Sequence, residues 1–340
     1  MNSLEPEICI YGAGSVGCYI GGRLLATGSR VTFIGRRRQR DSLLAHGITC
    51  TDLDGNTHRV EPGALLYSMD SAVASTADII LMTVKSAATD SAGRELANRI
   101  KRGAIVVSLQ NGLRNGELLR RWLRTNPVLA GMVPFNVLAR GDGRFHHGSG
   151  GMLAIEDHPA VPALNRLFTR AGLPLAAHVD IRAVQWSKLL LNLNNSINAL
   201  SGLTLREELS QRDFRRCLAL AQKETLGLLA LAGIPLAQLT KVRPQRLPGL
   251  LNLPDFLFKR LAKQMVAIDP LARSSTWEDL EAGRATEVDY INGEVVELAA
   301  SLGRRAAVNA RLVNLVKMAE AGGRRDWTAA ELYRALKTAA

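Results

Sequence analysis

The chain has 340 residues, which is long for one ordinary hydrophobic core and short for three, so we expect two domains. Hydrophobic residues make up 47% of the chain, and this excludes a disordered or fibrous protein. The formal net charge of +12 is compatible with a nucleic-acid-binding protein, but the arginines are spread along the chain and aromatic residues make up only 5%. We therefore favour a basic surface with a phosphate-bearing small ligand, and no nucleic-acid partner.

The sequence contains no recognisable export or membrane signal. Met1 to Glu7 carries acidic residues where a signal peptide needs positive charge. The leucine-rich stretch from Cys217 to Leu239 is interrupted by Lys223 and Glu224, so it predicts a core helix and no membrane span. The four cysteines lack any CxxC or Cys/His spacing. We expect neither a metal site nor a disulfide framework, and a cytoplasmic location.

The first half of the chain alternates short β-like runs with helical ones, a pattern typical of a parallel sheet with helices on both faces. These runs are Glu7–Tyr11, Ser15–Thr27, Val31–Ile34, Ile79–Val84, Ala88–Ile100, Ile105–Ser108 and Leu113–Arg124. Between Gly47 and Arg59 the residues alternate around Asp54-Gly55, which predicts a hairpin. Two further extended stretches, 128–135 and 143–155, follow.

The pattern changes near Asp180. Residues 173–180 predict a last strand and a linker, and nearly everything from Ile181 onward predicts helix, with breaks at glycines and prolines. The sequence therefore predicts an α/β Rossmann-type dinucleotide-binding domain over residues 1–180, followed by an all-α C-terminal domain over residues 181–340 that carries the substrate and catalytic residues.

A glycine-rich motif follows the first strand directly and opens the first helix. Its first glycine suits a tight turn, its second admits a pyrophosphate close to the backbone, and its third lets the helix pack on the strand. The helix N-terminus would then meet the pyrophosphate. The cofactor-binding residues predicted here are Gly12, Ala13, Gly14, Ser15, Val16 and Gly17.

The end of the second strand indicates which dinucleotide is bound. NAD enzymes place an Asp or Glu there on the ribose 2′-hydroxyl, whereas this chain has Arg36, Arg37 and Arg38. Guanidinium groups suit a 2′-phosphate, so we expect NADP in the form of NADPH.

Two more loops follow strands of the same predicted sheet, one containing Lys85 and the other Asn111. Lys85 is compatible with a plain surface lysine and Asn111 with a turn residue. Both nevertheless stand at the edge where nicotinamide, ribose and substrate would meet, so we assign them to the site.

The helix that opens the second domain carries a polar stripe. At about 100° per residue, Lys188, Asn192 and Asn195 share one face, and leucines cover the rest. Such a stripe normally faces water, but the leucine runs on both sides favour a buried or cleft position. A lysine there has its pKa lowered and can donate a proton near neutral pH.

Ser275 and Glu287 lie in a later polar stretch. Ser275 precedes an acidic turn and suits a helix N-cap, and Glu287 suits a surface pair with Arg284. The residues alone assign neither of them a function.

Together these stretches resemble the ketopantoate reductase (2-dehydropantoate 2-reductase) family over nearly the whole chain. The resemblance rests on GAGSVG, TVKS, QNG, WSKLLLN, RSST and TEVDYINGEVV, in that order. It implies an NADPH-dependent reduction of 2-dehydropantoate to pantoate, a step of pantothenate biosynthesis, with cofactor and 2-keto acid meeting in a cleft.

The resemblance also implies roles for single residues. Lys188 matches the proton donor, while Asn192 and Ser275 match substrate-binding residues. The residues that match cofactor-binding positions are Arg36 at the 2′-phosphate, and Lys85, Asn111 and Glu287. Asn111 is also expected to reach the substrate.

This chain departs from the family pattern at two positions. The second substrate asparagine usually falls where Ser196 stands, but alignment from the Ser-Gly-Leu-Thr that follows matches it to Asn195, which we prefer; Asn198 remains a third choice. Ala272 replaces an asparagine of some members, which leaves the exact 2-keto acid open.

Two other functions remain open: reduction of another branched 2-keto acid, and a non-catalytic NADP sensor that binds a partner through its helical domain. A sensor has no use for a proton donor, so Lys188 and its two amides argue against the second. Residues 241–271 are longer than a helix connection needs, and we expect either a lid or a homodimer contact, with exposed Phe256 and Phe258 favouring the dimer.

Overall fold

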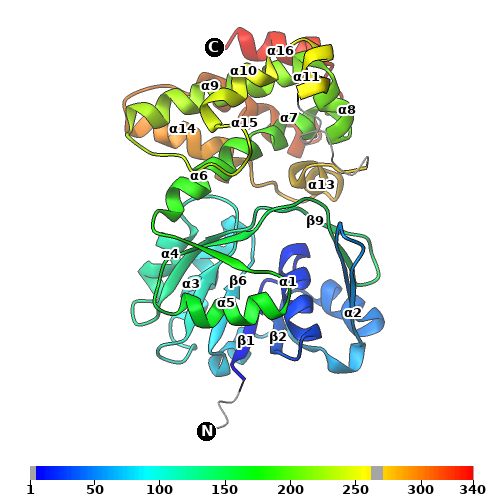
Figure 1. Cartoon of the computed structure of the whole chain (residues 1–340), viewed down its shortest axis with the longest axis vertical. Helices are drawn as coiled ribbons and strands as arrows, with labels where there is room; N and C mark the ends of the chain where they lie inside the picture. The colour runs from blue at the N-terminus through cyan, green and yellow to red at the C-terminus, as the bar shows by residue number, and fades with distance from the viewer. Residues whose placement is uncertain (1–4, 262–270, 340) are drawn as a thin grey trace. The chain divides into compact units, whose positions relative to one another are not determined.

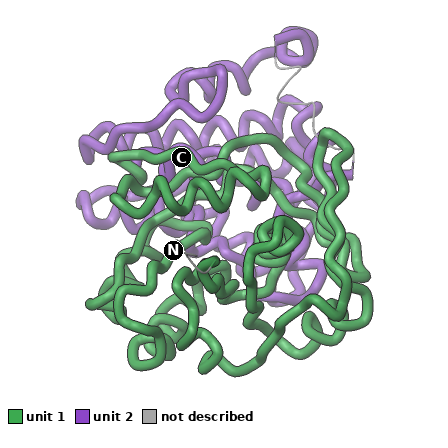
Figure 2. The backbone as a smooth tube through the Cα atoms, turned by 60° about the horizontal axis from the view of Figure 1, so that its bottom comes forward, with its two compact units in different colours: residues 1–181 green, residues 182–340 purple. Residues whose placement is uncertain are grey.

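The computed structural model describes residues 5–261 and 271–339, and the chain divides into two compact units, 1–181 and 182–340 (Figure 2). In the first unit strands alternate with helices, and in the second the elements are helical, as Figure 1 shows. An α/β unit followed by a helical one is the fold class that the sequence predicts.

The first unit is built around an eight-stranded sheet in the order β12-β11-β8-β7-β6-β1-β2-β5. Every neighbouring pair in it is parallel except β8 with β11. The strands are β1 (Glu7–Tyr11), β2 (Arg30–Ile34), β5 (Leu66–Ser68), β6 (Ile79–Met82), β7 (Ile105–Ser108), β8 (Val128–Met132), β11 (Leu153–Glu156) and β12 (Leu175–His178). The chain leaves β1 toward β2 and later returns on its other side as β6, which is the strand-order reversal where such sheets bind ligands.

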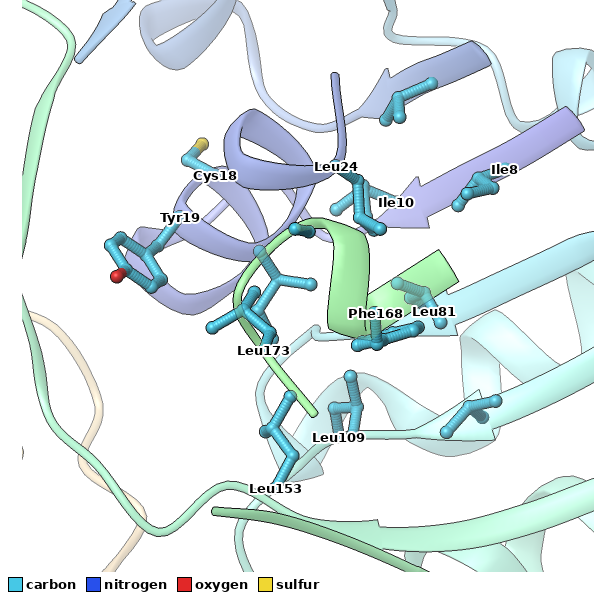
Figure 3. Packing of buried hydrophobic residues seen from close by; sticks show 14 of the residues in the cluster. Ile8, Ile10, Cys18, Tyr19, Leu24, Leu81, Leu109, Leu153, Phe168 and Leu173 are labelled. Atoms are coloured by element: carbon cyan, nitrogen blue, oxygen red, sulfur yellow. The ribbon is translucent and has the colours of Figure 1, made fainter. Parts of the chain in front are cut away.

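Helices cover both faces of this sheet. Ile8 and Ile10 of β1 point to one core, which α1 (Ser15–Ala26) and α5 (Val161–Arg170) close, while Cys9 and Tyr11 point to a second core under α3 (Thr89–Leu96) and α4 (Asn115–Trp122). Figure 3 shows the first core, where Leu24 and Phe168 lie among the strand side chains. Strands buried on both faces explain the continuous apolar runs in the sequence.

A second, four-stranded sheet has the order β4-β3-β10-β9. The antiparallel pair β3 (Ile48–Thr51) and β4 (Thr57–Val60) is the predicted hairpin, and the Asp52 carboxylate accepts hydrogen bonds from the backbone N–H groups of Asp54 and Asn56 in its turn. The sequence does not indicate that β10 (Arg144–His147), which is antiparallel to β9 (Val137–Ala139), pairs in parallel with β3. The helix α2 (Arg37–His46) precedes this sheet.

The second unit consists of helices and two short 3-10 turns among its described residues. These are α6 (Ile181–Asn192), α7 (Asn194–Ser201), α8 (Leu205–Ser210), α9 (Arg212–Leu231), η4 (Pro244–Arg246), α10 (Leu247–Leu251), α11 (Asp255–Leu261), α13 (Ser275–Glu281), η5 (Val288–Tyr290), α14 (Asn292–Ser301), α15 (Ala307–Glu320) and α16 (Ala329–Lys337). Capping boxes start α8, with Thr204 and Glu207, and α16, with Thr328 and Glu331.

Three further features bear on the sequence predictions. None of the helices in the described ranges is long and apolar enough to cross a membrane. The four cysteines are free and buried. Phe256 is 73% exposed, but Phe258 is fully buried under the guanidinium group of Arg215, so the expectation that both are exposed is wrong for Phe258. Residues 262–270 of the segment 241–271 lie outside the described residues.

Candidate active site

The register of the parallel strands brings their carboxyl ends together. Tyr11 of β1 pairs with Ile34 of β2 and with Met82 of β6, and Met82 pairs with Ser108 of β7. The loops after these four residues therefore leave the sheet side by side. They carry the glycine motif, Arg36, Lys85 and Asn111, and four sets of residues predicted from the sequence thus share one edge of the sheet.

The glycine motif forms a tight turn that is fastened to β2. The backbone N–H groups of Gly12 and Ala13 both donate to the carbonyl oxygen of Ile34, at 3.0 and 2.9 Å. Gly12 has φ = +118°, a conformation that L side chains rarely adopt. The hydroxyl of Thr83 donates to the Gly12 carbonyl oxygen at 2.7 Å, and this bond ties the turn to the end of β6.

The three glycines of the motif differ in the space around them. A Cβ at Gly12 would lie 2.5 Å from the backbone nitrogen of Val84, and one at Gly17 only 2.3 Å from the Gly12 carbonyl oxygen. Gly14, by contrast, has nothing within 4 Å of an added Cβ. Gly14 stands at the start of α1, where Ser15 and Val16 follow, and its open side borders the helix N-terminus, an end that favours anionic groups.

The arginines after β2 are exposed. Arg36 precedes α2, and Arg37 and Arg38 form its first turn, which contains no acidic residue. The Tyr67 hydroxyl donates to the backbone carbonyl oxygen of Arg36 at 3.1 Å and holds this corner. Three guanidinium groups at a helix N-terminus suit a phosphate group.

A buried polar network holds the loops after β6 and β7. The Gln110 amide nitrogen donates to the Val84 carbonyl oxygen at 2.9 Å and to the Thr89 hydroxyl at 2.7 Å, and Thr89 donates to the Asn115 side chain. The Ser86 hydroxyl donates to the Asn111 carbonyl oxygen at 2.7 Å. The roles of Ser86, Gln110 and Asn115 were not predicted from the sequence, although polar residues close after buried strands were a signal for them.

Lys85 and Asn111 stand on this network. Lys85 is exposed just before the 3-10 turn η3 (Ser86–Ala88), and Asn111 is partly buried. Because the network engages the backbone beside each residue, both side chains are carried on rigid loops at the ligand edge of the sheet.

In the second unit, the predicted polar stripe is spread over two helices. The sequence predicts one continuous helix, but α6 ends at Asn192 and α7 begins at Asn194, with a turn at Leu193. Leu193 keeps a right-handed helical conformation, and its backbone N–H donates to the Leu189 carbonyl oxygen at 3.0 Å. Lys188, Asn192 and Asn195 remain partly exposed, whereas most of the residues between them are buried.

The side-chain amine of Lys188 has a perturbed pKa. Burial, which disfavours the charged form, lowers the pKa of Lys188 to about 8. The ammonium group is thus largely protonated at neutral pH and releases its proton easily, as a proton donor must.

The contacts of α7 separate the three choices for the second substrate asparagine. Ser196 is buried and its hydroxyl donates to the Asn292 side chain at 2.6 Å. Asn198 is fully buried, and its amide nitrogen donates to Glu208 and to the Leu203 carbonyl oxygen. Asn195 is partly exposed, so it is the residue of the three that is accessible to a substrate.

Ser274, rather than Ser275, caps α13. The Ser274 hydroxyl accepts from the Trp277 N–H at 3.1 Å and donates to the carbonyl oxygen of Asn195 at 3.1 Å. The interpretation of Ser275 as an N-cap is therefore wrong, because Ser275 is the first residue inside the helix and is exposed. The structure thus places Ser275 one residue from a contact with Asn195.

Glu287 and Ala272 lie on either side of this region in the sequence. Glu287 is partly buried next to Thr286, whose N–H and hydroxyl both donate to Glu320. Arg284 pairs with Asp279 at 3.1 Å. Ala272 is 4% exposed, and its carbonyl oxygen accepts from Leu205 N–H. Across the described ranges, no group of three or more His, Cys, Asp or Glu residues is arranged to hold a metal ion.

Comparison with known proteins identifies the family of this chain. Residues 8–160 match the family model of the ketopantoate reductase PanE/ApbA, and residues 180–320 match the model of its C-terminal domain. The chain belongs to the ketopantoate reductase family. It is thus a member of a dinucleotide-binding oxidoreductase family.

Two relatives named 2-dehydropantoate 2-reductase align with nearly the whole of this chain. A 2-dehydropantoate 2-reductase of Halobacterium salinarum is 26% identical over 324 residues, 93% of this chain and 100% of the relative. One of Pyrococcus horikoshii is 28% identical over 330 residues, 93% of this chain and 98% of the relative.

Solved structures show the same fold. The crystal structure of a PanE/ApbA family ketopantoate reductase from Ralstonia eutropha has a TM-score of 0.79 at 27% identity, covering 93% of this chain and 99% of the other. A D-mandelate dehydrogenase with NADH and anilino(oxo)acetate has a TM-score of 0.75 at 19% identity, covering 93% of this chain and 99% of its own, and it shares the fold.

Proposed function

We propose that this protein catalyses the NADPH-dependent reduction of 2-dehydropantoate to pantoate, with Lys188 as the proton donor. The observation that carries the proposal is the partly exposed stripe of Lys188, Asn192 and Asn195, in which burial lowers the pKa of the lysine to about 8. The names of the Halobacterium and Pyrococcus relatives supply the substrate.

The first unit would hold the cofactor. The first-turn N–H groups of α1 and the open side of Gly14 accommodate a pyrophosphate, and Arg36 binds the 2′-phosphate. Lys85 and Asn111, on their rigid loops, reach toward the nicotinamide ribose, and the family resemblance implies Glu287 as a further cofactor-binding residue. NADPH, when bound, supplies the hydride that adds to C2 of the keto acid.

Lys188 completes the reduction by giving a proton to the ketone oxygen as negative charge develops there. Its ammonium group also stabilises that charge before the proton moves. Asn192, Asn195 and Ser275 orient the keto acid, and Ser275 is suited to its carboxylate because its hydroxyl is exposed and is not the cap of α13.

Two other functions fit fewer observations. Reduction of another branched 2-keto acid would use the same residues in a differently shaped pocket. A sensor that only reports NADP would need no amine with a pKa near 8 beside two accessible amides.

A panel of 2-keto acids tests the proposal directly. NADPH oxidation is followed with 2-dehydropantoate, 2-ketoisovalerate and other branched 2-keto acids, and the best pair is repeated with NADH. We expect the highest kcat/KM for 2-dehydropantoate with NADPH. A better rate with another keto acid would keep the reductase and change its substrate, and no turnover with any of them would favour the sensor.

We also propose that the protein is a homodimer and that the segment around α11 contributes to the contact. Phe256 and Leu261 are exposed apolar side chains on α11, and Leu271 is exposed at the far end of the segment. A structure of similar fold, from Staphylococcus aureus, is described as a dimeric ketopantoate reductase.

A further inference from the structure

Glu208 is a buried carboxyl group that the proposed reaction does not use. It lies on α8 with no exposed surface, and two side-chain amides of α7 converge on one of its oxygens. The amide nitrogens of Asn194 and Asn198 donate to Oε2 of Glu208 at 3.1 and 3.0 Å.

The second oxygen atom of Glu208 and the amide oxygen of Asn194 lack hydrogen-bond partners among the described residues. These two atoms, Oε1 of Glu208 and Oδ1 of Asn194, are buried. Both atoms are acceptors when Glu208 is ionised, and a buried acceptor without a donor costs free energy. One proton on Oε1 would supply a donor for Oδ1 of Asn194, so that the carboxylic acid and the amide form a cyclic pair with two hydrogen bonds.

Asn198 links Glu208 to the start of α13 through hydrogen bonds. Its Oδ1 accepts from the backbone N–H of Ser274 at 2.8 Å, and the Ser274 hydroxyl donates to the Asn195 carbonyl oxygen. The residue after Ser274 is Ser275. A chain of buried hydrogen bonds therefore runs from Glu208 to the point where α7 and α13 meet.

We propose that Glu208 is protonated in the folded protein, that its acid proton joins it to Asn194, and that this neutral pair acts through Asn198 to position Ser275 relative to Asn195. Glu208 is thus a positioning residue that touches no substrate. Its role in positioning rests on the proposed function, whereas its protonation does not.

The electrostatic surroundings agree with a neutral acid. Burial raises the pKa of Glu208 to about 8, although the two amides act in the opposite direction. The α7 helix presents amides, and α9 presents the thiol of Cys217, whose pKa is raised by burial, so that this group is neutral as well. The buried guanidinium group of Arg215, also on α9, donates to the Leu209 carbonyl oxygen and to Asp255.

The rest of α8 shows why Glu208 differs from its neighbour. Glu207 is exposed, and its pKa is lowered by the backbone and side chain of Thr204 in the capping box. Glutamine serves equally well in a capping box, so Glu207→Gln is a control that removes a carboxyl one residue away.

Glu208→Gln tests the protonation. Glutamine has the shape of the neutral acid, and its amide can donate to Asn194 while its oxygen accepts from both asparagines. A carboxyl whose pKa is raised in the fold loses stability as the pH rises from its unfolded value near 4.5 to its folded value near 8. The unfolding equilibrium constant of the wild type, relative to Glu208→Gln, should rise roughly tenfold per pH unit between pH 5 and pH 8.

The control should behave differently in the same window. Glu207 has a lowered pKa, so its contribution is already complete above pH 5, and Glu207→Gln should give a pH-independent difference. Infrared spectra provide the second measurement: the wild type at pH 7 should show the C=O stretching band of a protonated carboxyl group that Glu208→Gln lacks. Equal pH slopes for wild type and Glu208→Gln, or the absence of that band, would overturn the protonation.

The positioning role has its own readout. We expect Asn198→Ala to raise KM for the 2-keto acid about tenfold while the Kd of NADPH stays unchanged, because one buried link to Ser274 is lost. Glu208→Gln should keep KM within about twofold of wild type. An unchanged KM in Asn198→Ala would overturn the positioning role alone. If no keto acid is reduced, the proposed function fails, and the infrared band still decides whether Glu208 is protonated.

Discussion

A Cβ atom at Gly17 would lie 2.3 Å from the carbonyl oxygen of Gly12, closer than real Cβ contacts come. The obstacle is backbone, and the Gly12 carbonyl oxygen also accepts from Thr83, so it is not free to shift. Gly14, three residues before Gly17, has open space instead. Gly17 is therefore needed for packing, whereas Gly14 leaves the space that we propose for the pyrophosphate.

This difference predicts opposite outcomes for two alanine variants. Gly17→Ala should lower the free energy of unfolding by about 1–3 kcal/mol, as overpacked sites do. Gly14→Ala should fold like the wild type, since its φ of −84° suits alanine, but bind NADPH at least about tenfold more weakly because the methyl group occupies the pyrophosphate side. Thermal unfolding and fluorescence titration measure the two effects. Normal NADPH affinity in a folded Gly14→Ala would remove the pyrophosphate from this turn.

Lys188→Ala should lower turnover about 10²-fold or more while the Kd of NADPH stays near that of the wild type, because the amine acts on the ketone oxygen. The reduction that we propose requires the protonated amine. Activity should therefore be full below the pKa of about 8 and fall as the pH rises through it. A pH profile of kcat/KM measures this.

The pH profile needs a control, because Glu208 also has a pKa near 8. Glu208→Gln removes that group and should leave the alkaline loss of activity in place. A flat pH profile of kcat/KM in Glu208→Gln would assign the titration to Glu208. Near-normal turnover in Lys188→Ala would show that Lys188 is not the proton donor.

Arg36→Ala should weaken NADPH binding by about 1.5–3 kcal/mol and NADH binding far less, because it removes a charge-assisted contact that only the 2′-phosphate can make. Arg30→Ala is the matched control: Arg30 is exposed at the opposite end of the same strand, where it pairs with Glu7. Titration of each variant with both cofactors measures the effect. Equal losses for NADPH and NADH would show that Arg36 does not discriminate between them.

Sedimentation should show a dimer at micromolar concentration. Phe256→Ser should shift it toward monomer without loss of stability, since Phe256 is 73% exposed. Phe258→Ser is the contrasting variant, because this buried ring packs under Arg215 and its loss should destabilise the fold. A wild-type monomer would contradict the dimer, and a folded Phe256→Ser that remains a dimer would move the contact elsewhere.

Features set by local chemistry were predictable from the sequence. The turn after Tyr11 needs glycines within a few residues of each other, and the hairpin after Thr51 uses an Asp-Gly turn, so both appear in the sequence as short motifs. The strand ends at Tyr11 and Ser108 were also predictable, because a glycine-rich turn follows Tyr11 and a Gln-Asn-Gly loop begins two residues after Ser108.

Features set by distant contacts were not predictable in this way. Ser274 and Ser275 suit an N-cap equally, and contacts with Asn195 and Asn198 of another helix select Ser274. The turn at Leu193 interrupts a helical stretch that contains no glycine or proline, so the sequence does not predict it. The burial of Phe258 depends on Arg215 of another helix.

The last prediction concerns the choice of 2-keto acid. Ala272 lacks the amide that some family members have there, so we expect 2-dehydropantoate to be preferred over 2-ketoisovalerate by a modest ratio of kcat/KM. A hydrogen bond to a neutral hydroxyl is worth about 0.5–1.5 kcal/mol, a factor of about two to ten. Ala272→Asn should raise the ratio by that factor if its amide reaches the substrate hydroxyl.

Because Ala272 is buried, a second variant at this position is needed to separate the packing effect from the effect of the amide. The side chain is 4% exposed, so a larger residue should lower the free energy of unfolding by about 1–3 kcal/mol whatever its chemistry. Leucine has nearly the shape of asparagine without the amide, and Ala272→Leu therefore reports the packing effect alone. A ratio that rises in Ala272→Asn and stays unchanged in Ala272→Leu assigns the discrimination to the amide. Equal ratios in both would mean that position 272 only packs, and that the substrate hydroxyl is recognised elsewhere.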